Sequence, residues 1–298
     1  MSAVSMGTFS EVRESLRYLF ADIIGEQDGS MPHLPAGLPE SVVPVASEAI
    51  HLLIEYQGTK YAKLYVDRLK RFVGKQGVDE AMLLEIARLM AMRMSYEDAI
   101  RIAQLKLLEL EAYPDTPRAD DVRKLRLDEM VEALPTLVAE PLLDVLNWLG
   151  WVHKGVKIHF STANRFSIRR LKIEASLKRW RRYSIRYSKE RNWVERWLHM
   201  IDRALARQPA AARAIVDTAA MVQGYGDAYR HGLADWHAII DGLAKPTFDG
   251  VLRLPDLAGA IAEARAAAMP DPRQSALKRK IAEIRSRGAA AGTDAAAE

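Results

Sequence analysis

The residues best suited to catalysis or metal binding are few in this sequence and widely spaced. The pairs His153/His159 and His231/His237 are each six residues apart, which puts the two members on different faces of a helix. A metal site at either pair would need carboxylates from distant segments. The chain contains no Cys, which excludes disulfides, thiolate nucleophiles, cysteine-held iron–sulfur clusters and cysteine-based zinc sites. We therefore expect no catalytic residues and no metal site in this chain.

One glycine motif stands out, the Gly-x-Gly at positions 224–226. Tyr229 occupies the position where a dinucleotide-binding fingerprint needs Gly, and neither a phosphate-binding loop nor a Gly-x-Ser-x-Gly elbow is present. The motif predicts a rigid corner between two helices, with Asp227 capping the second, and a ligand-binding corner is the alternative. The residues of this corner are Gly224, Tyr225, Gly226, Asp227 and Arg230.

The positive charge is concentrated in one segment, the basic block 154–191. It carries 13 Lys and Arg against two acids, whereas the rest of the chain has 30 basic and 37 acidic residues. Such a block is typical of a surface that meets nucleic acid or an acidic protein, and a solvated helix face paired with the chain's own acids is the alternative. The residues expected to bind a partner are Arg169, Arg170, Lys178, Arg179, Trp180, Arg181, Arg182 and Tyr183.

The hydrophobic periodicity predicts a mostly α fold, an irregular multi-helix bundle with at most one short hairpin near 152–162. Interruptions are expected near Pro135 and Pro141, because proline cannot donate in a helix interior. Beyond the helical pattern that starts at Ser41, the expected helices cover 79–94, 95–113, 127–148, 166–182, 188–207, 209–223, 228–243, 254–268 and 271–287.

Local signals predict how two of these helices begin and pack. Ser95 has the position of an N-cap, with Asp98 three residues on as in a shortened capping box. Glu97 and Arg101 are spaced to form an i,i+4 pair in the same helix. The buried stripe of the helix over 79–94 is expected to consist of Leu83, Ala87, Met90 and Met94.

Composition also suggests the domain organisation. We expect an N-terminal arm and Gly/Pro-rich linker over 1–40, with an amphipathic segment at 9–24, and a helical domain over 41–245. A helical extension over 246–287 and a disordered Ala/Gly-rich tail over 288–298 would follow. No signal peptide and no run of about 18–20 apolar residues is visible, so the expected protein is soluble and cytoplasmic, without membrane contact.

Several short motifs, in order and spacing, resemble one known family. They are Ile54-Glu55-Tyr56-Gln57 with Tyr61 to Leu69, Met94-Ser95-Tyr96-Glu97-Asp98 with Arg101 to Lys106, Arg169 to Trp180, and Gly224-Tyr225-Gly226-Asp227 with Arg230 to Leu233. Over about 45–243 the chain resembles the C-terminal helical domain of the indolepyruvate:ferredoxin oxidoreductase beta-subunit family. Gln223 and Ala228 depart from that pattern, in which Lys and Thr are usual.

The resemblance implies membership in a complex that oxidatively decarboxylates 2-oxo acids with thiamine diphosphate, iron–sulfur clusters and coenzyme A. A thiamine site needs a Gly-Asp-Gly start and a downstream Asn pair, which this chain lacks, and cluster ligands would be Cys. The cofactors are therefore expected on partner subunits, and the chain itself is expected to be a non-catalytic accessory subunit, or a fragment of a longer protein. Its expected partners are the catalytic 2-oxo acid oxidoreductase subunits and ferredoxin, with a nucleic-acid-binding helical protein as the alternative.

Overall fold

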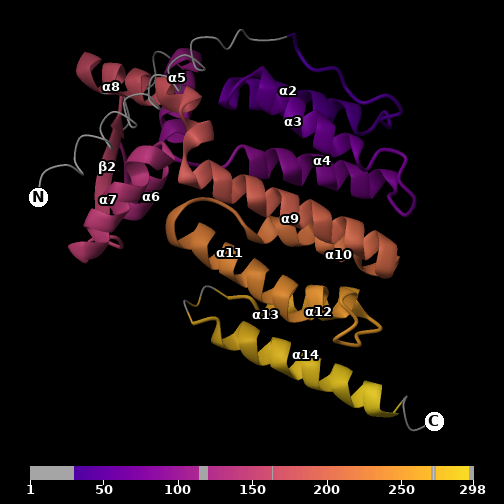
Figure 1. The fold of residues 1–298 in the computed structure, drawn as a ribbon. Coiled ribbons are helices and arrows are strands. Elements are labelled where there is room, and N and C mark those ends of the chain that lie inside the picture. Colours follow the sequence, from indigo (N-terminus) through magenta and orange to yellow (C-terminus); the bar gives the residue numbers. More distant parts are fainter. Residues whose placement is uncertain (1–29, 114–119, 163, 270, 272, 295–298) are drawn as a thin grey trace, which may run out of the picture. The chain divides into compact units, whose positions relative to one another are not determined.

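The computed structural model describes residues 30–113, 120–162, 164–269, 271 and 273–294 (Figure 1). Helices make up most of these residues, so the mostly α fold predicted from the sequence is confirmed. Residues 1–29 of the expected arm, which include the amphipathic segment at 9–24, lie outside the described residues. Residues 30–40 contain turns and no helix. The chain divides into two compact units, and each is considered by itself.

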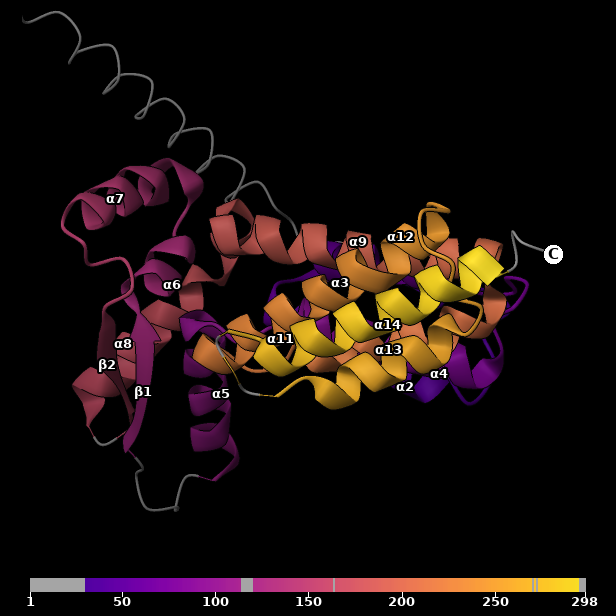
Figure 2. The ribbon, with the colours of Figure 1, turned by 90° about the horizontal axis from the view of Figure 1, so that it is seen from below.

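The first unit takes Ser30, Met31, 54–61 and 97–189 of the described residues. Its helices α5 and α8 pack against each other, and both contact strand β2. Figure 2 shows the strands β1 and β2 side by side. The elements of this unit are α5 (Ala99–Ala112), β1 (Asp120–Arg126), α6 (Leu127–Glu132), α7 (Thr136–Trp148), β2 (Gly155–Ser161) and α8 (Arg165–Ser176).

The two strands form an antiparallel pair in which Asp121 lies opposite Phe160 and Leu125 lies opposite Val156. Leu125 and Phe160 therefore share one face of the sheet, and both are buried. The strand expected near 152–162 is confirmed as β2, but its partner is β1 rather than a neighbouring segment of a local hairpin. Strand β1 occupies residues between the helices that the sequence predicts over 95–113 and 127–148.

Prolines shape the next helices in two different ways. Pro135 separates α6 from α7, as predicted. The interruption expected at Pro141 is wrong, because α7 continues through it. Pro141 removes the hydrogen bond to the carbonyl of Leu137, and both residues are exposed, so water can satisfy that carbonyl.

The second unit takes 32–53, 62–96 and the chain from Glu190 onward. Helices α2 (Val43–Tyr56), α3 (Thr59–Lys70) and α9 (Ile185–Arg207) each have their larger part in it. Its other elements are α4 (Glu80–Met94), α10 (Ala212–Asp217), the 3₁₀ turn η4 (Thr218–Met221), α11 (Gly226–Ile239), the π turn η5 (Ile240–Ala244), α12 (Lys245–Phe248), α13 (Leu257–Ala267) and α14 (Ser275–Asp294).

The core of the second unit follows the predicted stripes. On α4, the four expected residues Leu83, Ala87, Met90 and Met94 are all buried. Trp197 and Trp236, from α9 and α11, are fully buried and anchor the centre of this unit. The segment 246–287, expected as a separate extension, belongs to this same unit, where α13 and α14 pack against each other and against α11 (Figure 2).

The caps of α4 and α5 differ from the prediction. Asp98, not Ser95, is the N-cap of α5, and its carboxylate accepts a 2.7 Å hydrogen bond from the Arg101 N–H. Ser95 instead ends α4, where its hydroxyl donates to the carbonyl of Ala91. The expected Glu97–Arg101 pair is also wrong, because the Arg101 guanidinium pairs with Glu55.

Three expected helices end elsewhere. The helix predicted over 166–182 ends at Ser176, and two short 3₁₀ turns follow it. The helix predicted over 209–223 is divided into η3 (Pro209–Ala211), α10 and η4. The tail expected from Gly288 on is wrong up to Asp294, because α14 extends that far, while 295–298 lie outside the described residues. None of the described helices is both long and apolar enough to cross a bilayer.

Candidate functional site

The basic block contains one residue that the fold removes from the surface. Arg181 is 1% exposed, and its guanidinium donates to both carboxylate oxygens of Asp98 at 2.7 and 2.9 Å and to the carbonyl of Tyr56 at 2.8 Å. It also lies 3.9 Å above the Tyr56 ring. The prediction that Arg181 binds a partner is therefore wrong, because its hydrogen-bonding capacity is used inside the first unit.

Other expected partner-binding residues also serve the fold of this unit. Arg170 forms an ion pair with Glu174 at 2.8 Å and donates to the carbonyl of His159. Lys178 donates to the carbonyl of Glu55. The Arg182 guanidinium lies 4.7 Å from the centre of the neighbouring Tyr183 ring, and Arg182, Tyr183 and Trp180 are all half-buried. These contacts indicate that much of the block is structural.

Three exposed cations of the block lie on one side of α8. Arg165, Arg169 and Lys172 follow an i, i+4, i+7 spacing, all three are exposed, and none forms an ion pair with another described residue. We call these three residues the α8 basic face. Phe166 and Ile173 of the same helix are also exposed, at 80% and 58%. Of the predicted partner-binding residues, only Arg169 belongs to this face, and Arg179 is exposed just beyond α8.

Sequence reasoning missed an exposed apolar surface of the first unit, which lies on α7. Only Ala139 of this helix is buried, and Trp148 is 85% exposed. The signal was present in the sequence, since Leu, Val and Trp outnumber the polar residues of this helix. The α7 apolar surface consists of the exposed residues Leu137, Val138, Leu142, Val145, Trp148, Leu149 and Trp151. A contiguous apolar surface of this kind marks an interaction site more often than a solvated helix face.

The predicted corner at 224–230 is a tight turn that starts α11. Gly224 and Gly226 have φ values of +70° and +63°, a conformation that side chains disfavour, and Tyr225 between them is the N-cap residue. The prediction that Asp227 caps this helix is wrong. Asp227 lies in the first turn of α11 and forms an ion pair with Arg230. This pairing supports the rigid-corner interpretation.

Close packing after this corner depends on Gly232. A Cβ at this position would lie 2.1 Å from the carbonyl oxygen of Met221, so α11 approaches the backbone of η4 more closely than any other residue would allow. Tyr229, one turn earlier, is buried, and its ring lies 5.7 Å from the guanidinium of Arg93. The motif over 224–233 therefore fixes how α11 packs in the second unit.

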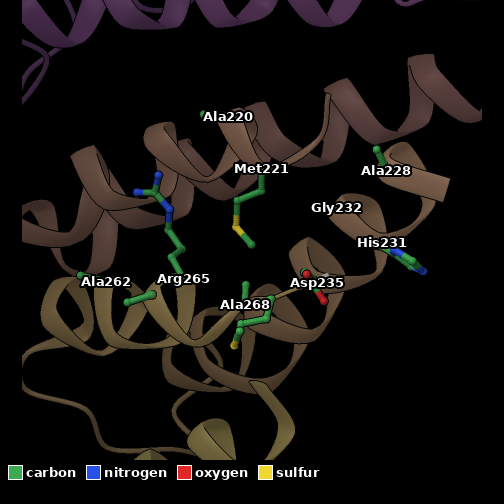
Figure 3. Close-up of a pocket in the computed structure, with 11 residues that line it drawn as sticks. Ala220, Met221, Ala228, His231, Gly232, Asp235, Ala262, Arg265 and Ala268 are labelled. Carbon is green, nitrogen blue, oxygen red and sulfur yellow. The ribbon is translucent and has the colours of Figure 1, made fainter. Parts of the chain in front are cut away.

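A cavity of about 610 Å³ opens beside this packing, between η4, α11 and α13 (Figure 3). Most of its wall is small and apolar, with five Ala and the side chains of Met221 and Met269. Its charged lining residues are Arg265 of α13 and Asp235 of α11, with His231 as a further polar one. In Figure 3, Met221 descends from η4 and Arg265 rises from α13. Neither Arg265 nor Asp235 was singled out from the sequence, where both look like ordinary helix charges.

The two charged residues of the cavity differ in their partners. Asp235 is 7% exposed, and its Oδ1 accepts a 2.7 Å hydrogen bond from the side chain of Gln274. The Arg265 guanidinium forms no hydrogen bond or ion pair with another described residue, and it does not pair with Asp235. Within the described ranges, no three His, Asp or Glu side chains come together as a metal site.

Comparison with known families gives one match. A family model described as a family of unknown function, DUF6537, matches residues 42–242, which is more than half of the 298 residues. The matched region runs from α2 into η5, so it contains the α7 apolar surface, the α8 basic face and the corner, but not α13. Curated proteins and solved structures gave no match. The chain belongs to this family of unknown function, DUF6537.

Proposed function

We propose that this chain is a non-catalytic accessory subunit of a thiamine-diphosphate-dependent 2-oxo acid:ferredoxin oxidoreductase complex of the indolepyruvate type. The resemblance of its motifs supports the class of complex. The observation that carries an interaction role is the α7 apolar surface, because soluble proteins rarely leave so contiguous an apolar face uncovered. The occupant of this surface is a catalytic 2-oxo acid oxidoreductase subunit.

The chain's own residues do not fit the cofactors of such a complex. Iron–sulfur clusters are held by thiolates, and the sequence has no Cys. A thiamine diphosphate site needs a Gly-Asp-Gly start and a downstream Asn pair, and the sequence contains neither. In this proposal both cofactors belong to partner subunits, and this chain contributes binding surfaces.

The α7 apolar surface has the composition of an interface core. Trp148 and Trp151 are the residue type most enriched among the energetic anchors of interfaces, and Trp148 is the more exposed of the two. The helix carries Glu140 and Asp144 but no Lys or Arg. A partner surface that suits it is apolar at its centre with cations at its rim, because charge complementarity fixes the register of association.

The α8 basic face suits a second, acidic partner, which in this proposal is ferredoxin. Arg169 and Lys172 have no competing ion pair with a described residue, so their charges remain available to steer an acidic protein. Reversing both charges (Arg169→Glu with Lys172→Glu) should lower the association rate and its salt dependence. Arg207→Glu, at an exposed residue of α9, is the matched control and should leave both unchanged.

The complex itself is tested by co-expressing the chain with thiamine-dependent oxidoreductase subunits from the same source and purifying it through a tag. A thiamine diphosphate- or cluster-containing partner should co-elute in fixed stoichiometry. If the chain elutes alone while those subunits assemble without it, the proposal is wrong.

Nucleic-acid binding is the second candidate function, and the α8 basic face is the observation that favours it, because exposed cations beside Phe166 could contact phosphates and stack on a base. A gel shift with generic DNA and RNA at two salt concentrations tests it. Binding that Arg169→Glu with Lys172→Glu abolishes would support this function, and no shift at low salt would exclude it.

A further inference from the structure

One buried carboxylate of the second unit, that of Asp235, has no counter-charge. Among the described residues two acids are buried, Glu190 at 2% exposed and Asp235 at 7%. The Glu190 carboxylate forms an ion pair with the guanidinium of Arg93, whereas no Lys, Arg or His of the described chain forms one with Asp235. Buried charges in proteins are ordinarily paired, because a charge that leaves water without a partner loses its hydration energy. The space beside Asp235 is therefore suited to a cation.

Gln274 holds this carboxylate in place through one of its two oxygens. The side-chain amide of Gln274 donates a 2.7 Å hydrogen bond to Oδ1 of Asp235. The backbone of Gln274 has a φ of +53°, a conformation that no other non-glycine residue of the described chain adopts. Strained residues of this kind persist where surrounding contacts hold them, and they cluster at ligand sites. Oδ2 of Asp235 accepts no hydrogen bond from a described residue, so it is available to a donor.

The space next to Asp235 is the cavity between η4, α11 and α13, which Asp235 lines. Its volume of about 610 Å³ lies within the range of ligand pockets in proteins. Ala228 and Ala266 leave its space open, and Met221 and Met269 supply flexible apolar surface that adapts to a ligand body. The cavity therefore fits an organic molecule that carries an apolar part beside its charge.

Arg265 does not hold the same end of such a molecule. In Figure 3, Met221 lies between Arg265 and Asp235, so the two charged side chains belong to opposite ends of the cavity. A guanidinium only donates hydrogen bonds and is itself a cation, so it offers nothing to an ammonium. A cationic head group is therefore held at the Asp235 end alone, and the apolar wall takes the rest of the ligand.

We propose that this cavity binds a primary amine with an apolar body. Its ammonium donates to Oδ2 of Asp235, and its body packs on Met221 and Met269. The hydrogen bond between an ammonium and a carboxylate is about twice as strong as one between neutral groups, so the charged head group gives the selectivity. The site lies within the second unit and does not involve the α7 apolar surface, so the accessory role and this site succeed or fail separately.

Hexylamine and hexanol test the charge of the ligand, because they share one alkyl chain and differ in the head group. Ligand-observed NMR titrations with the full chain give both dissociation constants. Hexylamine should bind at least about tenfold more tightly than hexanol, because its head group adds a charge-assisted contact at a buried carboxylate. Equal affinities would overturn the proposal, as would the absence of detectable hexylamine binding up to about 20 mM.

Two variants in the same cavity assign the contact. Asp235→Asn keeps a carbonyl oxygen that accepts from Gln274 and replaces Oδ2 by an amide, so it should weaken hexylamine to the level of hexanol. Arg265→Gln also removes one charge from the lining but touches no contact of the ligand. It is the matched control and should not weaken hexylamine. Hexylamine binding that Asp235→Asn leaves unchanged, or equal losses in the two variants, would contradict the proposal.

The methionine methyl groups locate the ligand in the chain without any change of charge. With isotope-labelled methionine methyl groups, hexylamine should shift the signals of Met221 and Met269, whereas the exposed Met31, which does not line the cavity, should keep its signal. Met221→Leu and Met269→Leu identify the two signals. Shifts confined to other methionines would overturn the proposal. This measurement and the comparison of the two probes decide the outcome on the unsubstituted chain if circular dichroism shows that Asp235→Asn has lost its fold.

Discussion

Substituting Arg93 by Met should destabilise the second unit by about 3–5 kcal/mol, because it leaves a buried carboxylate without its guanidinium. Arg93 and Glu190 are each 2% exposed and form a 2.5 Å ion pair. A second nitrogen of Arg93 donates to the carbonyl of Val222 at 2.7 Å, and the guanidinium lies 4.9 Å from the centre of the Trp193 ring. Arg93→Met keeps the length and apolar volume of the side chain, so the loss reports on charge and hydrogen bonding.

The predicted loss of stability is large because the Arg93–Glu190 pair is buried, and an exposed ion pair on α4 provides the comparison. Arg88 of α4 pairs with Glu85, but the Arg88 side chain is 53% exposed. Exposed pairs of this kind contribute at most about 1 kcal/mol, so Arg88→Met should cost less than that. The double variant Arg93→Met with Glu190→Met should recover most of the stability lost in Arg93→Met, because an apolar pair carries no desolvated charge.

The assay is urea unfolding followed by tryptophan fluorescence, since Trp193 lies beside the pair and 5.0 Å from the ring of Trp236. The wild type, Arg93→Met, Glu190→Met and the double variant form a double-mutant cycle, and Arg88→Met is its exposed control. A loss below about 1 kcal/mol for Arg93→Met would refute the reasoning. So would a double variant whose loss equals the sum of the two single losses, because the pair would then contribute no coupling.

Two further predictions concern α11. Gly232→Ala should lower the free energy of unfolding by about 1–3 kcal/mol or more, because the new Cβ would overlap a carbonyl of η4. Helix propensity alone predicts the opposite, a gain in stability of up to about 1 kcal/mol. Thermal or urea unfolding shows which sign is correct. Burial and then the charge of Arg196 lower the pKa of His237, with Asp241 opposing them. Below pH of about 6.5 the unfolded state therefore binds a proton that the folded state does not, and the free energy of unfolding falls as the pH drops toward about 5. His237→Gln should reduce the dependence of the free energy of unfolding on pH in this range. An unchanged pH dependence would contradict the prediction.

Sequence periodicity predicted the elements whose burial is local to one helix. The stripe of α4 could be read directly, because Leu83, Ala87, Met90 and Met94 recur at helical spacing and all four face the core. Strand β1 could not be predicted in this way. Its residues 123 and 124 are both basic, Leu125 is the one buried residue among 121–126, and its partner β2 lies some thirty residues away. Pairing between remote segments leaves no periodic signal.

The candidate sites show the same limit. The composition identified the basic block, but it could not separate the buried Arg181 from the surface cations, because the ion-pair partner of Arg181, Asp98, lies 83 residues earlier. The same carboxylate caps α5, so one residue fixes both a helix start and a buried arginine. The cavity was not predictable, since its walls come from three elements whose approach depends on Gly232 and on packing far along the chain.

The α7 apolar surface offers the most direct test of the accessory role. Val145 and Val251 are both exposed, but only Val145 belongs to this surface. In the co-expressed complex, Val145→Glu should weaken association with the catalytic subunit by about 30-fold or more, the effect of removing a central interface contact, while Val251→Glu should change it less than about twofold. Equal affinity of the two variants, measured by surface plasmon resonance with both proteins folded, would contradict the account.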